Sequence, residues 1–91
     1  MIISVELSFY PLVEDFESAI TNFITHLIDT PHLSVSSGPM STLLQGEFTV
    51  VFDTLKKELA AAFTQYPAVF TIKIANACPI TSQDSPGLVS L

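Results

Sequence analysis

Residues 33–46, LSVSSGPMSTLLQG, contain two short segments of alternating apolar and polar residues on either side of a Gly-Pro pair. The first segment runs from Leu33 to Ser36, and the second runs from Met40 to Gln45. Because glycine and proline are the residues that tight turns favour, we expect the two segments to form a β-hairpin.

The second strand of this hairpin carries adjacent hydroxyls, Ser41 and Thr42, which alternation sends to opposite faces of a sheet. If Leu44 faces the core, then Thr42 does too, whereas Ser41, Leu43 and Gln45 face away. We prefer this register. A shift by one residue would exchange the two sets, and the sequence leaves both registers open.

Helical patterns flank the hairpin on both sides. Residues 14–29 repeat apolar side chains at three- and four-residue steps, have acids in the first turn and stop before Pro31. After the hairpin, Gly46 is expected to break the strand, and a second helix is predicted from about Thr49 to Gln65. Its predicted buried stripe comprises Phe52, Leu55, Leu59, Ala62, Phe63 and Tyr66.

Strict alternation identifies the first and last strands. From Ile2 to Tyr10 the apolar residues share one face, and Pro11 is expected to end the strand. The same pattern returns from Ala68 to Ala75. The residues predicted to face the core are Ile3, Val5, Leu7 and Phe9 in the first strand, and Phe70, Ile72 and Ile74 in the last.

The order strand, helix, strand, strand, helix, strand predicts an α+β fold. It is typical of a ferredoxin-like βαββαβ sandwich, with a four-stranded antiparallel sheet and two helices on one face. Right-handed crossovers would make the first and third strands the central neighbours and leave the other face uncovered. We expect this domain to span residues 1–80 and residues 81–91 to form a C-terminal tail.

Composition limits the possible partners. The 91 residues include three lysines, no arginine and nine acids, which give a net charge of -6. Such a chain is poorly suited to neutralising phosphates, so we expect neither nucleic-acid binding nor attraction to anionic membranes. The apolar content of 48% exceeds what one small core needs, which predicts self-association as a homodimer or homotetramer.

The sequence also bears on location and cofactors. No charged, apolar leader precedes the first strand, and no apolar run approaches the ~20 residues of a membrane span, so we expect a cytoplasmic protein. The single cysteine, Cys78, excludes an internal disulfide and a cysteine-only zinc site. We expect neither a metal nor a cofactor.

The uncovered sheet face would collect small hydroxyl side chains together with one acid and one base, Glu6 and Lys73, as neighbours on adjacent strands. Two interpretations stay open: a solvated or dimer-packed sheet, and a pocket that hydrogen-bonds a small polar ligand. Catalysis is the weaker expectation, because His26 and His32 lie in or after the first helix and no basic residue adjoins Cys78 in the sequence.

Three stretches become specific when taken together: LSFYPLVEDF at 7–16, STLLQGEFTVVFDTLKKEL at 41–59 and NACP at 76–79. In that order and spacing they resemble the YkoF-like thiamine/hydroxymethylpyrimidine-binding family over residues 2–80. The resemblance implies a ferredoxin-like fold and non-enzymatic binding of thiamine or its pyrimidine part, associated with uptake or salvage of the vitamin. The founding type of the family carries two such domains, so this one-domain chain would rebuild the pair by self-association.

Carried over by position, the resemblance implies ligand contacts on the strands and at the pocket rim. Two positions depart from the family pattern. A longer basic or amide side chain is expected at the position of Glu6, and a small polar residue is expected at the position of Lys73. Together with the uncovered face, the expected ligand-binding residues are Glu6, Ser8, Tyr10, Ser41, Thr42, Leu43, Lys73 and Cys78.

We therefore expect a cytoplasmic binding protein that performs no chemistry on its ligand and acts as a homo-oligomer. The alternative is a regulatory or structural interaction module whose exposed sheet mediates oligomerisation without a small-molecule ligand. In that case Leu43, Val69 and the tail would be the contacts.

Overall fold

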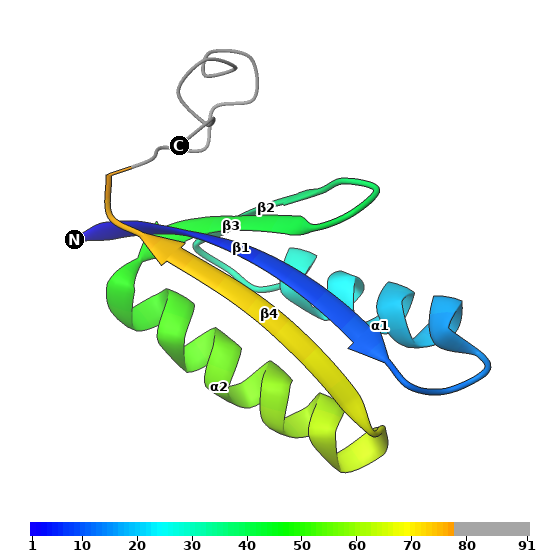
Figure 1. Cartoon of the computed structure of the whole chain (residues 1–91). Helices are drawn as coiled ribbons and strands as arrows, with labels where there is room; N and C mark the ends of the chain where they lie inside the picture. Colours follow the sequence, from blue (N-terminus) through cyan, green and yellow to red (C-terminus); the bar gives the residue numbers. More distant parts are fainter. Residues whose placement is uncertain (78–91) are drawn as a thin grey trace.

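The computed structural model describes residues 1–77, so the expectations for Cys78 and for the tail at 81–91 lie outside the described residues. Strands and helices follow in the predicted order (Figure 1): β1 (Ile2–Pro11), α1 (Phe16–Ile28), β2 (Leu33–Ser37), β3 (Thr42–Glu47), α2 (Phe48–Gln65) and β4 (Ala68–Ala75). All strand pairs are antiparallel, in the order β2-β3-β1-β4. The fold is therefore the predicted ferredoxin-like sandwich, with both helices on one side of the sheet.

The β2–β3 hairpin adopts the preferred register. Leu44 is fully buried and Thr42 is only 5% exposed, so both face the helices. The strand begins at Thr42 rather than at Met40, because the Gly38 amide donates to the Ser41 carbonyl at 2.9 Å and keeps the residues between them in the turn.

The core lies between the sheet and the helices, and the alternation predicted for β1 is confirmed. Phe9 stacks on Phe70 with a distance of 4.5 Å between ring centroids, and it also lies against Phe23 of α1. The buried core comprises Ile3, Val5, Leu7, Phe9, Ala19, Phe23, Leu27, Leu44, Val51, Leu55 and Ala62.

The first helix is shorter than its sequence pattern. Asp15 is its N-cap, with a side chain that accepts from the Ser18 amide at 3.4 Å, so Glu14 and Asp15 precede the helix instead of forming its first turn. Pro11 is the last residue of β1 and lies opposite Ala68, rather than outside the strand. No helix within residues 1–77 combines the length and the apolar content needed to cross a bilayer.

The prediction that Gly46 breaks the strand is wrong. Gly46 lies inside β3, paired with Ile3 on one side and with Leu33 on the other. A Cβ at this position would lie 3.2 Å from the His32 carbonyl oxygen and 3.4 Å from a methyl group of Val51. The glycine therefore permits close packing of three chain segments.

The stripe predicted for α2 and the inward face predicted for β4 are partly wrong. Leu55 and Ala62 are buried, but Phe52 and Phe63 are 38% and 55% exposed, and their places in the core are taken by Val51, Thr54 and Glu58. Ile72 and Ile74 of β4 are also exposed. The reason is that β4 is an edge strand, whereas α2 packs mainly over β3 and β1.

Candidate functional site

A small polar cluster centred on Glu6 lies on the sheet face opposite the helices, called the open face from here on. The Ser41 hydroxyl donates to Glu6 Oε2 at 3.1 Å, and Lys73 Nζ lies 3.4 Å from Glu6 Oε1. The predicted neighbourhood of Glu6 and Lys73 is confirmed, because the two residues are direct partners in the β1–β4 register. Leu43 pairs with Glu6 from the other side. The Glu6 side chain is 44% exposed, so the carboxylate remains accessible to a ligand.

Next to this cluster, β1 and β3 separate. Their pairing ends at Leu7 and Thr42, whereas β1 continues beside β4 as far as Pro11. The β2–β3 turn stays attached to β1 through the Ser8 hydroxyl, which donates to the Met40 carbonyl at 3.2 Å. The separation leaves a hollow of about 410 Å³ between the end of β1, the turn and α1.

The hollow is mainly apolar with a few hydroxyls, a composition typical of small-molecule sites. Its volume is also within the range of roughly 300–1,000 Å³ that such sites have. The lining residues are 7–11 of β1, Phe16, Ile20 and Ile24 of α1, and 38–42 of the turn and β3. Four of the predicted site residues are thus brought together in one place, namely Ser8, Tyr10, Ser41 and Thr42.

Thr42 contributes a hydroxyl to the lining of this hollow, and the residue as a whole is only 5% exposed. None of the side-chain hydrogen bonds found within residues 1–77 involves its hydroxyl, whereas the hydroxyls of Ser8 and Ser41 both donate to protein acceptors. No side-chain oxygen or nitrogen in this part of the chain is both sealed from solvent and without a partner, and Thr42 lines the hollow. It can donate to or accept from a molecule in the hollow at no cost to an existing bond.

Two aromatic rings stand at the edge of the hollow. Tyr10 is 51% exposed and Phe16 is 50% exposed, and each offers a flat apolar surface for stacking. Tyr10 was predicted as a site residue. Phe16 was not, because the helical period of residues 14–29 assigns it to the core stripe of α1.

The remaining predicted residues lie elsewhere. Glu6, Leu43 and Lys73 lie together on the open face and do not line the hollow, and Cys78 falls outside the described residues. The open-face cluster and the hollow share Ser41, whose hydroxyl bonds Glu6 and whose chain lines the hollow.

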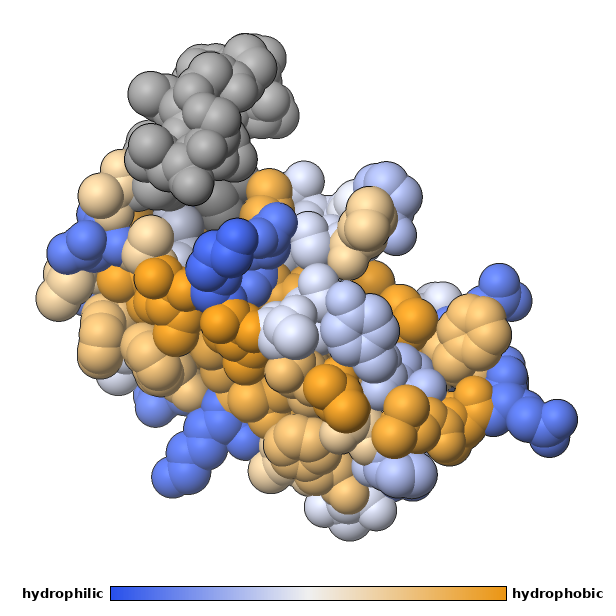
Figure 2. Space-filling view, viewed as in Figure 1, coloured by the Kyte–Doolittle hydropathy of each residue, from blue (hydrophilic) through white to orange (hydrophobic). Residues whose placement is uncertain are grey.

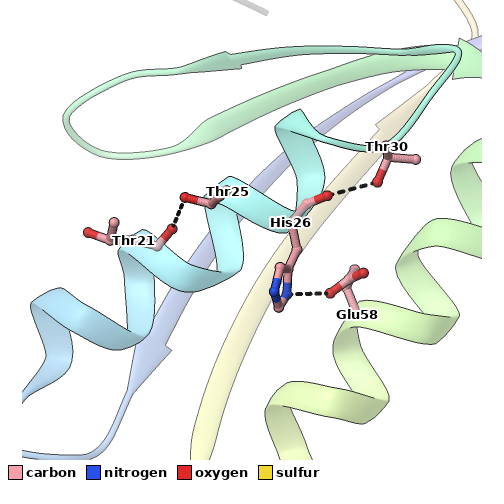
Figure 3. A network of polar contacts seen from close by, with 5 residues as sticks. All are labelled: Thr21, Thr25, His26, Thr30 and Glu58. Carbon is pink, nitrogen blue, oxygen red and sulfur yellow. Dashed lines mark hydrogen bonds and ion pairs between the residues drawn. The ribbon is translucent and has the colours of Figure 1, made fainter.

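His26, which the sequence places in the first helix, has a structural contact. His26 Nδ1 of α1 lies 3.3 Å from Glu58 Oε1 of α2 (Figure 3), and the Glu58 side chain is only 8% exposed. The pair links the two helices, and it is on the helix side of the molecule rather than beside the hydroxyls of the hollow. Within residues 1–77, no three His, Cys, Asp or Glu side chains gather as metal ligands.

Comparison with known proteins gives one family match and several similar folds. Residues 2–81 match the model of the YKOF-related family. A protein from Streptococcus pneumoniae has a TM-score of 0.74 and 28% identity, over 82% of this chain and 86% of that chain. No curated protein matches the chain.

Two more distant structures share the fold alone. A protein from Thermotoga maritima that is provisionally assigned to thiamine biosynthesis or salvage has a TM-score of 0.70 and 23% identity, over 81% of this chain and 82% of that chain. A domain of unknown function from Bacillus cereus has a TM-score of 0.71 and 22% identity, over 90% of this chain and 84% of that chain.

Proposed function

Because the chain belongs to the YkoF-related family, we propose that it is a cytoplasmic, non-enzymatic binding protein for thiamine or its hydroxymethylpyrimidine moiety. Binding serves uptake or salvage of the vitamin, and the protein acts as a homo-oligomer. The observation that carries the proposal is the hollow between β1, α1 and the β2–β3 turn, in which no side-chain hydrogen bond within residues 1–77 involves the Thr42 hydroxyl; the Glu6 carboxylate lies outside the lining and adjoins it through Ser41. The provisional role of the Thermotoga maritima protein in thiamine biosynthesis or salvage points to the same vitamin.

The chemistry of the hollow suits the pyrimidine. An aminopyrimidine offers ring nitrogens that accept hydrogen bonds and an exocyclic amino group that donates them. The Thr42 hydroxyl can donate to a ring nitrogen, and Glu6 with Ser41 can accept from the amino group. The apolar walls from α1 would cover the ring faces.

The cationic thiazolium of thiamine has complementary groups at the rim. A cation over the face of Tyr10 or Phe16 gains about 0.5–2 kcal/mol, depending on how far it is desolvated. The net charge of -6 favours a cationic ligand over an anionic one.

The proposal that no chemistry follows binding rests on the surroundings of the hydroxyls. Ser8 donates to a main-chain carbonyl and Ser41 to a carboxylate, and His26 is engaged with Glu58 on the helix side. Serine nucleophiles are typically activated by an imidazole or an amine, and neither Ser8 nor Ser41 donates to such a group, so these contacts favour recognition over catalysis.

The test is isothermal titration calorimetry with thiamine and with hydroxymethylpyrimidine, on the full chain and on Thr42→Val. Valine keeps the shape of threonine and removes the hydroxyl, so we expect Kd to rise about tenfold, which corresponds to ~1.4 kcal/mol for one lost hydrogen bond. The matched control is Thr54→Val, which changes an equally buried threonine of α2 whose hydroxyl donates to the Val50 carbonyl. Its Kd should stay at the wild-type value.

Absence of binding by the wild-type chain at millimolar ligand would refute the proposed function. Unchanged affinity of Thr42→Val would remove the hollow as the site even if binding is observed.

A second candidate function is a structural or regulatory interaction module without a small-molecule ligand. It is favoured by the exposed apolar side chains, among them Val69 at 49% exposure on the open face. An oligomer that binds neither ligand would support this candidate over the first.

A further inference from the structure

One end of the hollow borders an acidic stretch of the chain. Pro11 of β1 and Phe16 of α1 both line the hollow, and the connection between them contains Glu14 and Asp15. Glu17 follows in the first turn of α1, and all three acids are exposed. Figure 2 shows strongly hydrophilic side chains beside apolar surface at this end of the molecule, where β1 leads into α1. Three carboxylates therefore adjoin the lining.

Helical spacing places Glu17 on the side of α1 that lines the hollow. Ile20 and Ile24 belong to the lining, and Glu17 precedes them by three and seven residues. Residues at these spacings share one face of a helix. A ligand group that projects from the hollow along α1, toward the first turn of the helix, therefore approaches the Glu17 carboxylate.

The start of α1 would otherwise attract an anion. A helix N-terminus carries partial positive charge and free main-chain amides, and it commonly binds phosphate groups. In this chain a carboxylate of the protein occupies that position, because the Asp15 side chain accepts from the Ser18 amide at 3.4 Å. Glu14 and Glu17 add two further negative charges beside it. The helix end next to the hollow therefore repels an anion instead of binding one.

The cationic side chains lie elsewhere. The chain has three lysines and no arginine. Lys56 and Lys57 are exposed on α2, and Lys73 lies 3.4 Å from a carboxylate oxygen on the open face. None of the three, all within residues 1–77, lines the hollow. The lining instead contains the Thr42 hydroxyl, at a residue only 5% exposed, so the hollow offers hydrogen bonds but no counter-charge for an anion.

We propose that the acidic start of α1, with Glu17 as the main specificity-determining residue, makes the hollow selective for the free alcohol forms of its ligand and excludes their phosphate esters. The inference rests on the proposed function and deepens it, because thiamine and hydroxymethylpyrimidine each carry one hydroxyl that can be esterified. A phosphate monoester adds a charge of about −1.5 to −2 at neutral pH.

Repulsion and desolvation act in the same direction. On thiamine, the phosphate extends from the thiazolium end, which the proposed function places at the rim beside Phe16, and it approaches the acids there. On hydroxymethylpyrimidine, it would enter among the apolar side chains of α1, where removal of a phosphate from water has no compensating cation. Both esters should therefore bind more weakly than the parent alcohols.

The first test is isothermal titration calorimetry of the full wild-type chain with thiamine and with thiamine monophosphate, at about 20 mM and about 300 mM salt. At the lower salt concentration, we expect the Kd of the monophosphate to exceed that of thiamine by at least about tenfold. The ratio of the two Kd values should fall at the higher concentration, because salt screens the repulsion. A ratio that is the same at both concentrations would indicate steric exclusion and overturn the role assigned to the acids.

The second test reverses the charge of Glu17. Glu17→Lys should lower the ratio of the monophosphate Kd to the thiamine Kd about tenfold at low salt, since the phosphate is attracted and the thiazolium cation is repelled. The matched control is Asp53→Lys, which makes the same charge change at an exposed acid of α2 outside the lining and should keep the wild-type ratio. An unchanged ratio in Glu17→Lys would overturn the assignment to α1. The salt series on the wild type tests the proposal even if this variant does not fold.

The outcomes separate the selectivity from the proposed function. A wild-type chain that binds neither thiamine nor hydroxymethylpyrimidine contradicts the proposed function and the selectivity with it. A wild-type chain that binds thiamine and its monophosphate with equal Kd contradicts the selectivity alone. Tighter binding of the monophosphate than of thiamine also contradicts it.

Discussion

Replacing Glu6 by glutamine removes the negative charge of the candidate site and keeps the size of the side chain. The carboxylate accepts from Ser41 at 3.1 Å and lies 3.4 Å from the Lys73 ammonium, whose side chain is 84% exposed. Solvent screens so exposed an ion pair, and the glutamine oxygen can still accept from Ser41. We therefore expect Glu6→Gln to lower the free energy of unfolding by less than about 1 kcal/mol.

Ligand binding should respond more strongly than stability. A hydrogen bond to a charged group contributes about 1.5–3 kcal/mol, and glutamine retains part of that interaction. Kd should rise roughly tenfold, which corresponds to ~1.4 kcal/mol. Thiamine and hydroxymethylpyrimidine share the amino group, so both should bind more weakly if Glu6 accepts from it. A loss confined to thiamine would instead identify Glu6 as the counter-charge of the thiazolium.

The measurement combines calorimetric titration with urea unfolding of the same samples. Glu47→Gln is the control, because Glu47 is also a half-exposed carboxylate in one ion pair, 2.8 Å from the N-terminal ammonium, and it is remote from the hollow. If both variants bind with wild-type affinity, Glu6 takes no part in recognition. If Glu6→Gln unfolds at much lower urea than Glu47→Gln, the carboxylate has a larger structural role than its exposure indicates.

Further predictions concern one site residue and three structural positions. Ser41→Ala removes the donor that orients Glu6, and calorimetry should show a Kd several-fold higher at nearly unchanged stability; equal affinity would exclude this role. His26→Ala leaves the buried Glu58 carboxylate without its 3.3 Å partner, so urea unfolding should show a loss of about 1–3 kcal/mol, and a change near zero would mean that water replaces the imidazole. Leu44→Ala empties a fully buried position and should cost about 3–5 kcal/mol in the same assay. Gly46→Ala inserts a methyl group 3.2 Å from a carbonyl oxygen and should cost about 1–3 kcal/mol, whereas a stabilised variant would show that β3 relaxes freely.

The parts of the fold that sequence predicted are those in which local pattern and tertiary packing agree. The alternation of β1, the turn at Gly38 and Pro39 and the period of α1 each indicate one structure. Gly46 was ambiguous, since a glycine can end a strand or allow close packing, and only the positions of His32 and Val51 decide between them.

The exposed face of α2 was mispredicted for a related reason. Apolar residues occupy more than one side of this helix, so periodicity alone does not say which side is buried. Phe52 and Phe63 would face the core if α2 lay over β4, but the helix lies over β3 and β1. That placement is a property of the assembled sheet and not of the helix sequence.

The candidate site was predictable where it depends on strand register. Glu6 and Lys73 were expected to be neighbours, and Ser41 and Thr42 were expected on opposite faces. The hollow was not predictable, because it depends on the point at which β1 and β3 stop pairing and on Phe16, Ile20 and Ile24, which reach it from a helix. Nothing in a one-dimensional pattern indicates that two adjacent strands separate.

The separation of β1 from β3 has a consequence for how recognition could be studied. From Ser8 to Pro11, β1 has a strand partner on one side only, so main-chain groups on the other side border the hollow. These amides and carbonyls are the same whatever side chains the positions carry. Part of the hydrogen-bonding capacity of the hollow is therefore fixed by the backbone path, and side-chain substitution will not reveal it. Replacing single amides of β1 by esters would reveal this contribution of the backbone.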